Sequence, residues 1–319
     1  MISAPYWQYC LPRWKSRLKK LDARLGLSVG STGLAWVHMD QQGDGLAVKA
    51  CGYLQGESQS VVWARFRSVV NLQKFQGLSL HVALAPADYQ LLLMEGVDVP
   101  AEELREAMRW RLGDLISFPA TEAAVDVFTL PEDAYRGHQR MLYTAVCQQR
   151  QIEALRVRAD SLKLKLASVS IPEIALCRLA QHLLEGEDST AILQVMEGGS
   201  LLGIFQGGAL YLVRQMAFSH PALVAAQYDN VLLEIQRSFD YFDSQIGKGM
   251  LRQLLLTPFP GMPTLAAHLA ANLDVPVRPL DLASVWPAAG TPPAAAETVD
   301  PALLAACLPA VGVVMRAEA

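Results

Sequence analysis

The chain has 319 residues, of which 52% are hydrophobic and 18% are charged, and its formal net charge is −4. The length allows two domains of about 100–200 residues each, and the apolar content excludes a disordered chain. The negative charge argues against a nucleic-acid partner, and five cysteines without CxxC spacing are typical of reduced thiols in a cytoplasmic protein.

Residues 1–24 differ in composition from the rest, with six basic residues against one acid. Apolar residues recur there at steps of three and four, which predicts an amphipathic helix. We interpret it as an interfacial helix that lies on an anionic membrane surface. Its membrane-facing side chains would be Trp7, Trp14, Leu18, Leu21, Lys15 and Lys19. The alternative is a helix docked on its own domain, with the basic face in water.

The next stretch, LGLSVGSTGLAWVHM at residues 25–39, predicts a hairpin of two apolar strands joined by a turn of Gly, Ser and Thr. Further along, the sequence predicts a strand over 46–54, a helix over 61–73 and strands over 80–85 and 89–94. This order of elements indicates a mixed α/β core with a covered sheet.

After residue 97 the pattern changes to that of a small α+β unit. It comprises an amphipathic helix over 100–115, strands over 123–130 and 140–147, a helix over 149–162 and a strand over 165–170. The first of these helices has acids in its first turn and arginines later, as the helix dipole favours. We expect this unit, at about residues 98–168, to be inserted into a first lobe that spans 25–170.

The second half of the chain contains a second apolar hairpin, AILQVMEGGSLLGIF, at residues 191–205. It is surrounded by helices over 171–184, 221–245 and 262–272, strands over 209–216, 251–257 and 275–280, a loop over 286–301 and a closing helix over 301–315. Two similar hairpins half a chain apart suggest a duplicated core with a cleft between the halves. The second lobe is expected over 171–319.

No motif marks a catalytic or metal site in this sequence. The six histidines lie far apart, and none has HxxxH or HExxH spacing. There is no GxSxG elbow, and the glycine-rich stretch at 198–208 lacks the Lys-Ser/Thr end of a phosphate loop. We therefore predict no catalytic residue and no bound metal.

The order and spacing of the segments resemble the actin-like proteins of type IV pilus assembly, the PilM family, and more closely their relative MshI of MSHA-type pilus biogenesis. The resemblance is carried by LGLSVGSTGLAWV, VDVPAEELREAMRWRLGDLISFP, LLEIQRSFDYFDSQ, LLLTPFPGMPTLAAHLAANLDVPVRPLD and ACLPAVGVVMR. It implies an α/β fold of the actin-like (ASKHA) class, a ribonuclease-H-like duplication of two lobes with a small α+β insert.

A nucleotide-binding member of that class would carry an Asp in each hairpin, close to the phosphates. Here Ser28 and Gln194 occupy those positions. Only Gly30, Ser31 and Thr32 keep the chemistry of a phosphate hairpin, because backbone N–H groups and hydroxyls suit an anion.

Two further departures weaken the expected nucleotide site. Glu197 adds a negative charge where phosphate would lie, and like charges repel at short range. In the segment that resembles the adenosine-binding one, Phe259 and two prolines replace glycines that would let a nucleotide approach the backbone. We expect no cofactor and no hydrolysis, since hydrolysis needs metal-held charge neutralisation; weak nucleotide binding stays open.

The resemblance also implies a partner, the cytoplasmic N-terminal tail of a bitopic PilN-like or MshJ-like inner-membrane protein. This tail would lie in a groove between the first core and the insert, where extended peptide capture is suitable. Apolar candidates for the lining are Val97, Val99, Leu112, Ile116 and Phe118. The alternative for each is ordinary core packing.

The chain is thus expected to be a non-catalytic cytoplasmic scaffold, peripheral to the inner membrane, of MSHA-like pilus assembly. One alternative is a divergent actin-like ATPase, which would need a carboxylate pair in its cleft. The other is the cytoplasmic module of a GspL-like secretion protein, which would continue into a membrane span.

Overall fold

The computed structural model describes residues 23–30, 33–42, 45–135, 140–219, 228–246, 250–286 and 300–315. The six side chains assigned to the membrane face of the N-terminal helix (Trp7, Trp14, Leu18, Leu21, Lys15 and Lys19) lie outside these ranges. So do Ser31, Thr32 and most of the loop expected over 286–301.

The first sheet has five strands in the order β3-β2-β1-β4-β8. Their bounds are β1 Arg24–Val29, β2 Gly33–Gln42, β3 Gly45–Gln55, β4 Ser79–Ala83 and β8 Lys165–Ser170. The strand β1 is antiparallel to β2 and parallel to β4. This sheet contains the first predicted hairpin, and we call the part of the molecule built on it the first lobe.

The second sheet repeats this plan in the order β11-β10-β9-β12-β13. Its strands are β9 Thr190–Met196, β10 Gly199–Gln206, β11 Ala209–Met216, β12 Gln253–Leu256 and β13 Val277–Pro279. As in the first sheet, the first strand β9 is antiparallel to the next one and parallel to β12. The two sheets correspond strand for strand, which is the duplication that the two hairpins predict. The part built on this sheet is the second lobe.

A third sheet, of order β5-β7-β6, carries α2 on one face and forms the insert. Its elements are β5 Tyr89–Glu95, β6 Ala123–Thr129, β7 Met141–Gln148 and α2 Ala101–Trp110. This membership corrects the boundaries expected at 98–168. The strand β5 precedes residue 98 yet pairs with β7, whereas β8 pairs with β4 of the first sheet. Short apolar strands contain no local signal for the sheet that they join, so the sequence pattern misplaced both.

The helix α2 also ends earlier than predicted, at Trp110 instead of Leu115. Gly113 has a φ of +25°, far from the value of about −63° that an α-helix requires. Residues Gly113–Leu115 therefore form a separate 3-10 turn. Two similar short turns, Pro86–Asp88 and Ala120–Glu122, precede β5 and β6.

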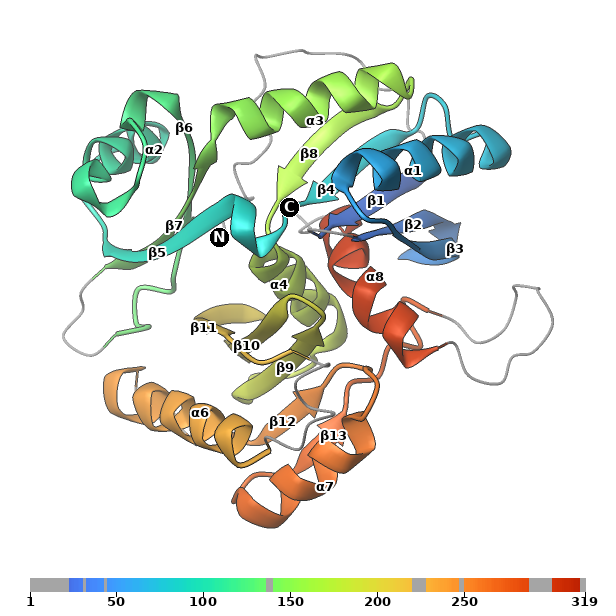
Figure 1. Cartoon of the computed structure of the whole chain (residues 1–319). Helices are drawn as coiled ribbons and strands as arrows, with labels where there is room; N and C mark the ends of the chain where they lie inside the picture. The colour runs from blue at the N-terminus through green and yellow to red at the C-terminus, as the bar shows by residue number, and fades with distance from the viewer. Residues whose placement is uncertain are drawn as a thin grey trace.

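The remaining helices form layers around the two large sheets (Figure 1). They are α1 Gln59–Gln73, α3 Gln149–Ser161, α4 Pro172–Leu183, α6 Tyr228–Tyr241, α7 Met262–Asn272 and α8 Pro301–Val314, with a π-helical turn Phe242–Ile246 after α6. Helices α1 and α3 pack on one face of the first sheet, while α4 and α8 lie between the two sheets. Helices α6 and α7 pack on the second lobe, on the side away from the first.

The closing helix α8 belongs to the second lobe by sequence, but it packs on the first sheet and on α4. Two glycines make these contacts close. A Cβ on Gly26 of β1 would lie 2.1 Å from the carbonyl oxygen of Ala310, and one on Gly312 of α8 would lie 2.3 Å from that of Ala175 in α4. The predicted division at residue 171 is therefore too simple, since α8 closes the first lobe.

Candidate functional site between the hairpins

The turn of the first hairpin uses its own backbone groups internally. The N–H of Gly30 donates to the carbonyl of Gly33 at 2.8 Å, and the carbonyl of Gly30 accepts from the amide of Gln59. The indole of Trp63 in turn donates to the amide oxygen of Gln59 at 3.0 Å. Gly30 therefore does not present the free N–H that a phosphate would need. The hydroxyls of Ser31 and Thr32 lie outside the described residues.

Tyr53 of β3 links the first lobe, beside the turn of the first hairpin, to the turn of the second hairpin. Its hydroxyl donates a hydrogen bond of 2.6 Å to the carboxylate of Glu197, in the turn between β9 and β10. The ring lies over Gly33, where a Cβ would come within 2.0 Å of the tyrosine oxygen. Burial, and to a smaller extent Glu197, raises the pKa of Tyr53 well above its ordinary value, so the hydroxyl stays protonated and remains a donor. A tyrosine–glutamate pair thus joins the lobes at the hairpin turns.

The two positions where a nucleotide site would need acids hold neutral side chains. Ser28 is half-buried in β1. Gln194 of β9 is fully buried, and neither its amide nitrogen nor its oxygen has a hydrogen-bond partner among the described residues. A metal-bound water requires negative charge at such positions, which a buried amide does not supply. Within the described ranges, no group of three or more His, Cys, Asp or Glu side chains could hold a metal.

The side chain of Phe259 does not lie where the sequence led us to expect it. We expected its side chain to block a nucleotide from the backbone, but it is 1% exposed and packs in the core of the second lobe. The turn that follows is made by Gly261, whose φ of +89° precedes α7. Phe259 therefore stabilises this lobe and does not project into a cleft.

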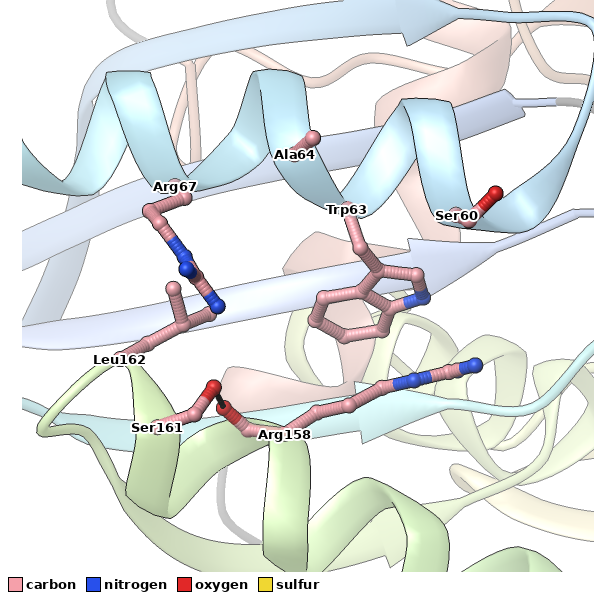
Figure 2. Close-up of a pocket in the computed structure, with 7 residues that line it drawn as sticks. All are labelled: Ser60, Trp63, Ala64, Arg67, Arg158, Ser161 and Leu162. Carbon is pink, nitrogen blue, oxygen red and sulfur yellow. Dashed lines mark hydrogen bonds between the residues drawn. The ribbon is translucent and has the colours of Figure 1, made fainter.

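Two of the hollows on the described surface lie away from the hairpins. One, of about 230 Å³, separates α1 from α3 and is shown in Figure 2; it is lined by Ser60, Trp63, Ala64, Arg67, Arg158, Ser161 and Leu162. The other, of about 400 Å³, lies where β6 and α3 begin and is lined by Thr121, Glu122, Gln148, Gln149, Arg150 and Glu153.

The five candidates for a peptide groove all pack in the core of the insert, beneath α2. Leu112 is 0% exposed and Ile116 is 9% exposed, so in this structure neither offers a surface to a partner. For these two residues the alternative of core packing holds. Val97, Val99 and Phe118 are partly exposed and remain candidates.

The insert is attached to the second lobe through tyrosine hydroxyls. The hydroxyl of Tyr143 in β7 accepts from the N–H of Val213 and donates to its carbonyl, both at 3.1 Å. Val213 lies on β11, the edge strand of the second sheet, so the hydroxyl occupies part of the free edge. This contact links the insert to the second lobe.

A buried carboxylate completes the same junction. Glu173 of α4 is 1% exposed and accepts hydrogen bonds from Tyr89 of β5, at 2.7 and 2.8 Å, and from Gln215 of β11, at 2.5 Å. Burial raises the pKa of Glu173, and the hydrogen bonds from Tyr89 and Gln215 oppose the rise. The side chain of Glu173 thereby connects the insert, α4 and the second lobe.

Neither the Tyr53–Glu197 contact nor the Tyr89–Glu173 contact was identified from the sequence. Tyr53 and Glu197 are 144 residues apart, and Tyr89 and Glu173 are 84 apart. The one available signal was Glu173 in an otherwise apolar helix start, because a carboxylate on a buried helix face needs partners.

No family model matches this sequence, and no curated protein is significantly similar to it. Solved structures are similar in fold. A PilM–PilN type IV pilus biogenesis complex contains a chain of 19% identity and TM-score 0.67, and the match covers 91% of this chain and 98% of that one.

A Bacteroides thetaiotaomicron protein with an actin-like ATPase fold and unknown function matches at 11% identity and TM-score 0.51, over 81% of this chain and 90% of that one. The cytoplasmic domain of EpsL, an inner-membrane component of the type II secretion system of Vibrio cholerae, matches at 13% identity over 73% and 81% of the two chains, with a TM-score of only 0.46. The predicted actin-like fold is confirmed by the first two similarities. In the described part of the chain, no helix has the length and apolar character needed to cross a membrane.

Proposed function

We propose that this chain is a non-catalytic scaffold of type IV pilus assembly, of the MSHA-like kind, that acts on the cytoplasmic side of the inner membrane. Its partner is the N-terminal tail of a PilN-like or MshJ-like protein. The similarity in fold to a chain of a PilM–PilN complex supports this partner, since it extends over 91% of the present chain.

The observation that carries the non-catalytic part of the proposal is the Tyr53–Glu197 hydrogen bond. It places a tyrosine ring and a carboxylate between the hairpin turns, where actin-like ATPases hold phosphate. The neutral Ser28 and Gln194 add to this argument. A triphosphate with its metal would have to displace the pair and would then meet Glu197 as a like charge.

The partner is tested by titrating the full chain with a labelled peptide of the PilN-like tail. We expect saturable binding that is lost in Val97→Asp/Val99→Asp, because a carboxylate would be buried against an apolar peptide. The control is Leu233→Asp in α6, a 45% exposed residue of the second lobe, which should bind like the wild type. A folded wild-type chain that does not bind the tail would overturn the proposal.

The enzymatic alternative is tested by calorimetry with Mg-ATP and by a phosphate-release assay. We expect neither binding heat nor release. Micromolar binding together with release would establish a divergent ATPase instead.

Membrane attachment through the N-terminal segment is tested separately: deletion of residues 1–24 should weaken binding to anionic vesicles, and unchanged binding would remove that segment from the proposal.

A further inference from the structure

The helices α1 and α3 give the first lobe a strongly basic outer face. Residues 59–74 and 149–165, which contain these helices and their ends, carry eight basic side chains and two acidic ones, in a chain whose net charge is −4. Both acids, Glu153 and Asp160, pair with the same residue, Arg156. In the part of the chain that the structure describes, no carboxylate lies within ion-pair distance of Arg67, Lys74 or Lys163.

Each of these helices is followed, within two residues of its end, by a lysine in an unusual conformation. Lys74 has a φ of 56° and Lys163 a φ of 58°, and they are the two non-glycine residues with positive φ among those described. Glycine is the usual residue at such a helix end, because a Cβ is strained there. A lysine is favoured there only by its charge, which interacts with the helix dipole. The hydrogen bond from Gly77 N–H to the carbonyl of Lys163, 2.8 Å long, holds the two ends together.

The hollow between these helices has the chemistry of an anion site. Figure 2 shows Arg67 reaching down from α1 and Arg158 running beneath the ring of Trp63, with the guanidinium carbon 5.1 Å from the ring centre. Ser60 and Ser161 also line it; the hydroxyl of Ser161 donates to the carbonyl of Arg158 at 2.7 Å, and that of Ser60 is hydrogen-bonded to Ser58 at 2.9 Å. The guanidinium groups suit phosphate oxygens, each of which accepts more than one hydrogen bond. The carboxylate of Asp88, which precedes β5, interacts electrostatically with Arg158.

Exposed aliphatic side chains lie on the same two helices. Leu72 is 79% exposed, Val157 is 56% exposed and Val61 is 38% exposed. To bind an acidic protein segment, this face would need only its positive charges. A surface that is both anionic and apolar uses the charges and the aliphatic groups together, as peripheral membrane binding does.

We propose that the α1–α3 face docks on an anionic lipid surface, with Arg67 and Arg158 contacting lipid phosphates. This inference deepens the proposed role at the inner membrane, on which it rests, and it assigns the side of the molecule that faces the bilayer. It uses residues other than the N-terminal segment.

The test is co-sedimentation of the full chain with vesicles of phosphatidylcholine mixed with phosphatidylglycerol, and with vesicles of phosphatidylcholine alone. Two double variants remove charge in different ways: Arg67→Gln/Arg158→Gln at the hollow, and Lys74→Gly/Lys163→Gly at the helix ends. We expect each lost charge to weaken binding to the mixed vesicles roughly five-fold. The glycine pair should not lower the melting temperature, because glycine suits the positive φ. The matched control, Arg237→Gln/Arg278→Gln in the second lobe, should bind like the wild type.

Three results would overturn the inference. The first is a wild type that shows no preference for anionic vesicles, and the second is unchanged vesicle binding in both test pairs. The third is a test pair that loses binding to soluble polyglutamate but keeps its binding to the vesicles. The last result would assign the face to an acidic protein segment. A chain that binds the partner tail but not the vesicles removes this inference alone. A chain that binds vesicles through this face but not the tail removes the proposed partner and leaves the inference standing.

Discussion

The hydroxyl of Tyr53 and the carboxylate of Glu197 lie 2.6 Å apart, although the two residues belong to different lobes. Tyr53 reaches Glu197 because Gly33 leaves room for its ring. Tyr53 of β3 and the turn of the second hairpin are thus connected directly by their side chains. This hydrogen bond contributes to the contact between the two lobes.

Tyr53→Phe removes the hydroxyl and keeps the ring. Because Glu197 is exposed and regains water, we expect the free energy of unfolding to fall by only about 1 kcal/mol. Hydrogen exchange at the turn of the second hairpin should become faster, which measures the loss of the connection locally. Mg-ATP binding should remain absent from this variant. A variant that gained nucleotide binding would show that the tyrosine occludes a working site.

Gly312→Ala tests the close packing of α8 on α4. The added Cβ would lie 2.3 Å from the carbonyl oxygen of Ala175, and backbone must move to accommodate it. We expect a loss of about 1–3 kcal/mol or more in denaturant unfolding. Gly198→Ala is the control, because a Cβ at that position meets no atom within 4 Å. Equal stability of the two variants would contradict the packing described here.

Asp126 of β6 makes stability depend on pH. Burial raises its pKa to about 7, although Arg105, at 3.7 Å, and the N–H of Val127 oppose the rise. Between about pH 4 and pH 7 the unfolded chain has released this proton and the folded chain has not, so the contribution of Asp126 to stability is largest at low pH and declines as the pH rises.

Asp126→Asn removes this ionisation. We expect the variant to unfold at a higher denaturant concentration than the wild type at pH 8. Its free energy of unfolding should be higher by up to about 4 kcal/mol there, and this difference should shrink towards pH 4. Unfolding curves at several pH values measure it. A variant that is less stable than the wild type at pH 8 would mean that the pair with Arg105 outweighs the cost of burial.

Leu112→Ala distinguishes core packing from partner binding. Because Leu112 is fully buried, the substitution should cost about 2–5 kcal/mol of unfolding free energy, whether or not a partner is present. Val99→Ala, at a partly exposed position, should cost less stability and weaken tail binding more. If Leu112→Ala kept full stability and lost only tail binding, the leucine would belong to the groove.

Local patterns predicted most elements and a mixed α/β core, because the periods of helices and strands are visible in short windows. The strands of both hairpins, the helix α3 and the start of α8 lie where these patterns indicated. The two hairpins predicted a duplicated core, and the resemblance to the PilM family implied that it is actin-like, which the similar structures confirm.

The candidate site was predictable only where its chemistry depends on single residues. The absence of acids at positions 28 and 194 can be read directly from the chain. Whether Leu112 lines a groove or fills a core could not be read, since an apolar residue on a helix suits both. The burial of Phe259, between β12 and α7, could not be read either, since an aromatic side chain in a connecting segment can face the core or the cleft.

The sequence alone thus determined the types of the elements, their order and the neutral character of the two hairpins, because each depends on residues close together in the chain. The tertiary structure alone decided that β5 joins the insert, that α8 closes the first lobe, that Tyr53 meets Glu197 and that two basic helices share one face. These features depend on contacts between distant segments, and such contacts leave no periodic trace in the sequence.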